Sequence, residues 1–191
     1  MQSRIFLIYA QPYDPITGGI IVLHKLCHIL NSLGHKAFMF PHLGQLPVDL
    51  PLRNQLSIGL QNLVDPLKPL DVNPTFQTPV LSFENLETIE QNDSFIAVYP
   101  EVIWGNPLNA KNVVRWFLHN PGFHTGKVYY QVGELYFRFG IETIPAQIPG
   151  STVSDSFLTV THCPTNVYNL DNASKARSGT AYCIRKGNHK P

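Results

Sequence analysis

Two adjacent glycines, Gly18 and Gly19, follow a polar turn and precede an amphipathic segment at residues 20–33. Glycine leaves the N–H groups at the start of a helix unobstructed, and the helix dipole places partial positive charge there, so this pattern favours binding of a phosphate group. Thr17 can cap the helix or add a hydroxyl to such a site. The motif is neither the dinucleotide fingerprint G-x-G-x-x-G nor a loop ending in Gly-Lys-Ser/Thr. The alternative interpretation is a tight turn that binds no ligand.

A histidine, His119, directly follows the apolar run at residues 113–118. An imidazole at the end of a buried strand can act as a general base or donate a hydrogen bond to a hydroxyl or phosphate. We therefore take His119 as the candidate catalytic residue. Glu101, Asn120 and His124 lie in comparable turns and are candidates for substrate binding. For each of these residues the alternative is a structural or solvated role.

Other chemistries find little support in the sequence. His24 and His28 are four residues apart, but the glutamate and third ligand of a zinc metalloprotease are missing, so we predict no metal. The cysteines Cys27, Cys163 and Cys183 are odd in number and far apart, which argues against a disulfide framework, and Cys27 fits a small core residue. No G-x-S-x-G motif of the α/β-hydrolase type is present.

Five basic residues can supply countercharge to a diphosphate or an acidic sugar, with surface solvation as the alternative. They are Arg115, Lys127, Arg138, Arg185 and Lys186.

The elements that must position these residues begin with a strand at residues 5–9. Its consecutive large apolar residues indicate burial on both faces, as in a parallel sheet covered by helices. Residues 20–33 carry apolar side chains at three- and four-residue steps, which predicts a helix, and Gly34 follows where a C-cap favours glycine. With a second strand at residues 37–40, this is a βαβ unit whose glycine loop lies at the carboxyl end of the first strand. Open α/β sheets bind ligands at that edge.

A proline-rich segment separates this βαβ unit from the rest of the predicted helices and strands. Seven prolines interrupt residues 41–79, which predicts an irregular excursion with one short helix at 52–64. Such an excursion either forms a wall of the ligand cleft or is a poorly ordered surface segment. Beyond it we predict a helix at 84–91 and strands at 80–83, 95–99, 113–118, 134–139 and 158–160, and a last apolar run at 180–184. The predicted fold is one Rossmann-like α/β domain over residues 1–191, with a mostly parallel sheet and helices on both faces.

Composition narrows the class of protein. A net charge of +1 argues against a nucleic-acid binder that works through a basic surface. Only 14% of the residues are charged, against 16 prolines and 11% aromatic residues, which indicates an apolar or partner-covered surface. The N-terminal apolar run is too short for a signal peptide, and no segment is long enough to span a membrane. We expect a cytoplasmic protein, with peripheral membrane contact still compatible.

Three segments together are similar to a known family, the bacterial GT-B glycosyltransferases of the retaining class that builds surface polysaccharides and lipopolysaccharide. They are residues 9–19 with 34–36 (GHK), residues 113–122 (VVRWFLHNPG) and residues 179–187 (GTAYCIRKG). The resemblance is to the amino-terminal half of these enzymes. It implies that the Gly18-Gly19 loop approaches the phosphates of the donor and that His119 lies beside the transferred sugar.

The resemblance also implies that a second domain takes part in the reaction. GT-B enzymes have two Rossmann-like domains with the active site between them, and the second holds most contacts to the nucleotide sugar. We therefore expect transfer of a sugar from a nucleotide-sugar donor, without a cofactor, to a surface-polysaccharide or glycan acceptor. This chain would need a C-terminal GT-B domain or a partner subunit to do so. The aromatic rings of Tyr129, Tyr130, Tyr136 and Phe137 are candidates for stacking on the acceptor.

Two alternatives remain. One is a non-catalytic carbohydrate- or nucleotide-binding module that pairs with a separate subunit. The other is a small standalone nucleotide-dependent enzyme, against which the missing fingerprint motifs count.

Overall fold

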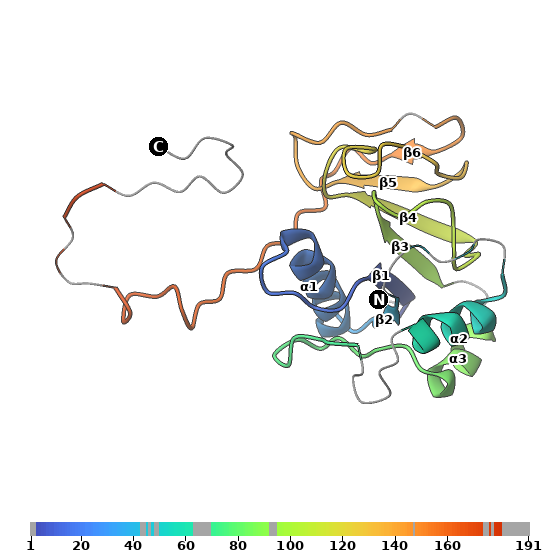
Figure 1. The fold of residues 1–191 in the computed structure, drawn as a ribbon, viewed down its shortest axis with the longest axis horizontal. Helices are drawn as coiled ribbons and strands as arrows, with labels where there is room; N and C mark the ends of the chain where they lie inside the picture. The colour runs from blue at the N-terminus through green and yellow to red at the C-terminus, as the bar shows by residue number, and fades with distance from the viewer. Residues whose placement is uncertain are drawn as a thin grey trace.

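The computed structural model describes residues 3–42, 45, 47, 50–62, 70–91, 95–146, 148–173, 176 and 178–180 (Figure 1). Its elements are β1 (Ile5–Ala10), α1 (Gly18–Ser32), β2 (Lys36–Pro41), α2 (Leu52–Asn62), α3 (Phe83–Glu90), β3 (Ile96–Pro100), β4 (Asn112–Phe117), β5 (Leu135–Arg138) and β6 (Thr152–Val153).

The six strands form one sheet in the order β2-β1-β3-β4-β5-β6, and every neighbouring pair is parallel. In this register Ile8 of β1 lies between Met39 of β2 and Val98 of β3. The chain places β2 on one side of β1 and then crosses to place β3 on the other. A crevice therefore opens beyond the carboxyl ends of β1 and β3, where open α/β sheets bind ligands.

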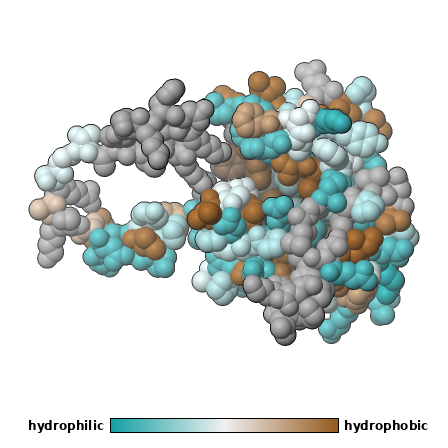
Figure 2. Space-filling model, viewed as in Figure 1, coloured by the Kyte–Doolittle hydropathy of each residue, from teal (hydrophilic) through white to brown (hydrophobic). Residues whose placement is uncertain are grey.

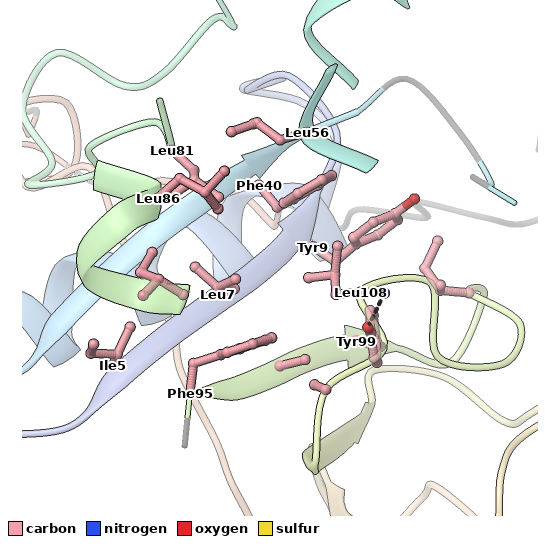
Figure 3. Close-up of a cluster of buried hydrophobic side chains, with 14 residues drawn as sticks. Ile5, Leu7, Tyr9, Phe40, Leu56, Leu81, Leu86, Phe95, Tyr99 and Leu108 are labelled. Atoms are coloured by element: carbon pink, nitrogen blue, oxygen red, sulfur yellow. Dashed lines mark hydrogen bonds between the residues drawn. The ribbon is translucent and has the colours of Figure 1, made fainter. Parts of the chain in front are cut away.

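Helices cover both faces of the sheet, as predicted. Because successive side chains of a strand point to opposite faces, the apolar run of β1 is shared between two cores. Leu7 and Tyr9 pack in the core beneath α2 and α3, which Figure 3 shows with Leu56 and Leu86. Ile8 and Ala10 of β1 point to the opposite face and pack against α1. This second core also contains Leu23, Leu26, Cys27 and Trp116.

The ends of α1 differ in how well the sequence predicts them. Gly34 has φ +85° and its N–H donates to the carbonyl of Asn31 at 3.0 Å, while the N–H of His35 donates to that of Leu30 at 3.0 Å. This is a Schellman motif, so the predicted C-cap is confirmed. The helix begins earlier than predicted, because Gly18 and Gly19 are its first two residues rather than the end of a loop.

The remaining predicted elements are shifted by a residue or two or are reduced. The helix predicted at 52–64 is α2, and residues 63 and 64 lie outside the described part. The strand predicted at 80–83 is a single bridge between Val80 and Met39, because α3 begins at Phe83. Residues 181–191, with Cys183, Arg185, Lys186 and most of the last apolar run, also lie outside the described residues.

The far edge of the sheet departs most from the prediction. Residues 158–160 are not a strand, although the N–H of Leu158 donates to the carbonyl of Arg138 at 3.0 Å and Trp116 Nε1–H donates to the carbonyl of Leu158 at 2.8 Å. The two-residue β6 takes the sixth place in the sheet instead. A strand of two residues is too short to leave a periodic pattern.

Candidate ligand-binding cleft

A cleft of about 570 Å³ lies at the carboxyl ends of β1, β3 and β4 and at the N-terminus of α1. Six residues singled out from the sequence line it: Thr17, Gly18, Gly19, Glu101, His119 and His124. They come from the start of α1 and from the turns after β3 and β4, which are up to about a hundred residues apart in the sequence, and the shared edge of the parallel strands brings them together. Asn120 is not among the lining residues. Its side-chain oxygen accepts the N–H of Ile144 at 2.8 Å, which ties down a neighbouring loop.

The start of α1 presents unpaired N–H groups to the cleft. The N–H of Ile21 makes the first bond within the helix, to the carbonyl of Thr17 at 3.0 Å. Among the described residues, the preceding N–H groups of Gly18, Gly19 and Ile20 have no hydrogen-bond acceptor. They are therefore available to an oxygen of a ligand, in the positive field of the helix dipole.

Thr17 does not cap the helix. Its side chain makes no cap hydrogen bond, and its hydroxyl instead donates to the carboxylate of Asp14. That bond, followed by one from the N–H of Ile16 at 3.0 Å, lowers the pKa of Asp14. Of the two roles predicted for Thr17, capping is thus wrong. The loop before α1 is braced by its own acidic residue, so the helix N–H groups are left uncovered.

His119 is held in one orientation by its neighbours. The N–H of Asn120 donates to Nδ1 of His119 at 2.8 Å, and the ring packs against Phe123 with a centroid distance of 4.2 Å. Since Nδ1 accepts a hydrogen bond, the neutral ring carries its proton on Nε2. No residue in the described part of the chain engages Nε2. His119 is therefore arranged to donate a hydrogen bond into the cleft.

Glu101 is a buried part of the cleft rather than a solvated loop residue. Its Oε2 accepts the N–H of Leu118 at 3.0 Å, and its carbonyl accepts the hydroxyl of Tyr130 at 2.6 Å. Burial raises the pKa of Glu101, and hydrogen bonds from its own N–H and from those of Leu118 and His119 oppose that rise. The carboxylate joins the ends of β3 and β4 at the cleft.

The sequence reasoning missed two aromatic lining residues, Tyr9 and His42. Their rings stack with a centroid distance of 3.7 Å and an interplanar angle of 22°, at the carboxyl ends of β1 and β2. The rule that places Gly18 and His119 at one edge applies equally to the end of β2. Applied to Pro41 and the residue after it, the rule would have found His42.

Arg115 corrects the expectation of a surface countercharge. It is fully buried, and Nε and Nη2 bind the two carboxylate oxygens of Glu134 at 2.9 and 2.6 Å. Nη1 also donates to the carbonyl of Ile103 at 2.6 Å, and Nη2 donates to that of Gly105 at 2.7 Å. The guanidinium also packs on Tyr130 at 4.4 Å. Both predicted roles of Arg115 are wrong, because the ion pair holds the loops under the cleft.

The expected stacking faces are likewise only partly exposed. Tyr130 and Tyr136 are buried in a small cluster with Phe117, so they cannot stack on a bound glycan. Tyr129 remains 65% exposed. Apolar side chains lie exposed among polar ones on the face shown in Figure 2. Two exposed apolar residues are associated with the cleft: Ile16 lines it, and Phe123 packs on His119.

The described residues contain no group of three histidine, cysteine or acidic side chains that could hold a metal. His24 and His28 have other partners: His24 Nε2 lies 2.9 Å from the carbonyl of Gln11, and Nδ1 of His28 accepts the N–H of Gln77 at 3.0 Å. Cys27 is buried, and burial raises the pKa of its thiol to about 12, in keeping with a core residue.

Burial of His24 predicts that the protein loses stability in mild acid. Burial lowers its pKa in the folded state, whereas the unfolded chain titrates near 6.5, so the unfolded state binds more protons below that pH. We expect the free energy of unfolding to be full above about pH 6.5 and to fall as the pH drops below it, by at most about 1.4 kcal/mol per pH unit for one proton. Urea unfolding measured from pH 8 to pH 5 gives the free energy of unfolding at each pH. In His24→Gln this free energy should fall less steeply with decreasing pH than in the wild type.

His28→Gln is the matched control on the same helix. The pKa of His28 is also lowered, first by burial and then by the charge of Lys25, but the side chain is more exposed, so we expect a smaller change in slope. An unaltered slope in His24→Gln would contradict the prediction.

No protein-family model, curated protein or solved structure matches the chain. Within the described residues, no helix combines the length and the apolar character needed to cross a membrane. The cytoplasmic location stays a prediction.

Proposed function

We propose that this chain is the acceptor-side, amino-terminal domain of a GT-B glycosyltransferase. In this proposal it transfers a sugar from a nucleotide-sugar donor to a glycan acceptor once it is joined to a second Rossmann-like domain or a partner subunit. One observation carries the proposal: the unpaired N–H groups of α1, the Nε2–H of His119 and the carboxylate of Glu101 line a single cleft at the sheet edge.

These groups suit glycosyl transfer. The departing diphosphate develops negative charge, which helix N–H groups stabilise without a metal. His119, with Nδ1 already occupied, donates to an oxygen of the sugar or phosphate rather than acting as a base in the orientation observed. Glu101 carries the one carboxylate among the described lining residues, and it can accept a hydrogen bond from a sugar hydroxyl.

The residues that line the cleft also support the proposal that a second domain or subunit completes the binding site. Among the described residues that line the cleft, none is a lysine or arginine, so these residues by themselves do not balance the charge of a nucleotide diphosphate. Ile16 and Phe123 are 79% and 68% exposed beside the cleft, which suits a surface covered by a ligand or a second domain. We therefore expect the chain alone to bind weakly and not to turn over.

The direct test is titration of the purified chain, followed by amide NMR spectra, with nucleotide sugars, nucleoside diphosphates and neutral oligosaccharides. We expect shifts of the Gly18, Gly19 and Ile20 amides with the phosphate-containing ligands, at millimolar to micromolar affinity. No release of free nucleotide is expected from the chain alone. Unchanged amides with every ligand of the panel at millimolar concentration would overturn the proposal.

A second candidate is a non-catalytic binding module that pairs with a separate subunit. The described residues of the cleft lining include no lysine or arginine, which favours this candidate, because a neutral saccharide needs no countercharge. The same titration separates the two candidates: binding of neutral oligosaccharides without any response to phosphate-containing ligands would support the module.

A further inference from the structure

The turn that carries His119 is held from the neighbouring strand. β3 and β4 are parallel neighbours, and Glu101 follows β3 where residues 118–120 follow β4. Glu101 Oε2 accepts the N–H of Leu118, the residue before His119, at 3.0 Å. The side chain that follows β3 thus binds the main chain one residue before His119.

Glu101 is itself fixed in place. It is 5% exposed, and its carbonyl accepts the hydroxyl of Tyr130 at 2.6 Å. Tyr130 packs against the guanidinium of Arg115 at 4.4 Å, and Arg115 is locked to Glu134. The carboxylate therefore has little freedom to follow the turn if the turn moves.

The orientation of the His119 ring depends on that turn. Nδ1 accepts the N–H of Asn120, at 2.8 Å, so the bond exists only while the main chain of residues 118–120 keeps its conformation. A neutral imidazole with Nδ1 as acceptor must carry its proton on Nε2. The conformation of the main chain at residues 118–120 therefore leaves Nε2 of His119, with its proton, for a ligand.

We propose that Glu101 is a positioning residue, which holds the main chain around His119 so that the imidazole stays in the Nε2–H tautomer and offers a hydrogen-bond donor to the cleft. The ligand atom opposite His119 is then an acceptor oxygen, such as a phosphate, ether or carbonyl oxygen. That part rests on the proposed function. The tautomer assignment does not, because it concerns the ligand-free chain.

Long-range 1H–15N NMR of the ligand-free protein tests the assignment, at a pH well above the value of about 6.5 at which free histidine titrates. We expect His119 to be wholly Nε2–H in the wild type. Glu101→Gln keeps a side-chain oxygen for Leu118 and should retain that tautomer. Glu101→Ala removes it and should produce a measurable Nδ1–H fraction.

Glu90→Ala is the matched control, because Glu90 is an exposed residue paired with Arg53 on α2, and it should leave the His119 spectrum unchanged. An Nδ1–H proton in the wild type, or a pure Nε2–H signal in folded Glu101→Ala, would overturn the proposal.

If Glu101→Ala does not fold, Glu101→Asp replaces it, since a shorter side chain draws the carboxylate away from Leu118 while the burial of an acid is kept. We expect the same mixed tautomers in that variant, and retention of pure Nε2–H there would also overturn the proposal. Failure of all ligands to bind, with the tautomer as expected, would contradict the proposed function and leave the positioning role intact.

Discussion

Replacing Arg115 by methionine is expected to lower the free energy of unfolding by about 3–5 kcal/mol, because it leaves the Glu134 carboxylate charged and buried without its partner. The side chains of the pair are 0% and 1% exposed. The carbonyls of Ile103 and Gly105 would lose their donors as well. Urea unfolding followed by circular dichroism measures the loss.

The double variant Arg115→Met/Glu134→Leu separates the two contributions. It removes both charges, so we expect it to recover most of the loss from the unpaired carboxylate. It should remain below the wild type, because two buried carbonyls stay without donors.

Arg53→Ala is the control, since its pair with Glu90 has side chains 50% and 39% exposed, and a change below about 1 kcal/mol is expected. A loss of similar size in Arg53→Ala and Arg115→Met would contradict the structural role given to the buried pair.

Replacing Gly19 by tryptophan is expected to weaken binding of the nucleotide sugar by at least about 100-fold, or roughly 2.7 kcal/mol. A Cβ at this position would lie 3.6 Å from Cδ1 of Leu118, so a large side chain extends from α1 towards the end of β4. It would fill the space between the helix N–H groups and His119. Calorimetry with a nucleotide sugar that binds the wild type gives the ratio of dissociation constants.

Gly19→Ala is the matched variant. Its Cβ makes only an ordinary contact with Leu118, and alanine is a better helix former than glycine, although Gly19 lies in the first turn and not in the helix interior, so we expect an unchanged or slightly higher melting temperature. Binding should fall far less than in Gly19→Trp. If Gly19→Trp is folded and binds as the wild type does, the ligand does not occupy this cleft.

Much of the fold follows from local patterns. The uninterrupted apolar run of β1 predicts a strand covered on both faces, and the structure divides it between two helix layers. Gly34 predicts the end of α1 because positive φ is a local requirement. Short or edge elements such as β6 and residues 158–160 escape prediction, since their pairing depends on neighbours rather than on a pattern of their own.

The candidate site also has features that could be predicted from the sequence and features that could not. The shared edge of parallel strands places Gly18, Glu101 and His119 together, and this much is readable from strand ends alone. Arg115 could not be assigned from its type, because its partner Glu134 lies 19 residues away and its packing surface is made by two tyrosines.

The sequence by itself determined that a parallel α/β sheet forms and that its glycine, glutamate and histidine turns meet at one edge, because strand burial and strand direction follow from local residue order. Only the tertiary structure decided which groups at that edge are available. Contacts between distant segments bury Arg115 and hold Glu101 at the end of β4, and the main-chain conformation that results lets the N–H of Asn120 occupy Nδ1 of His119. Hydrogen bonds made across such distances leave no periodic trace in a chain.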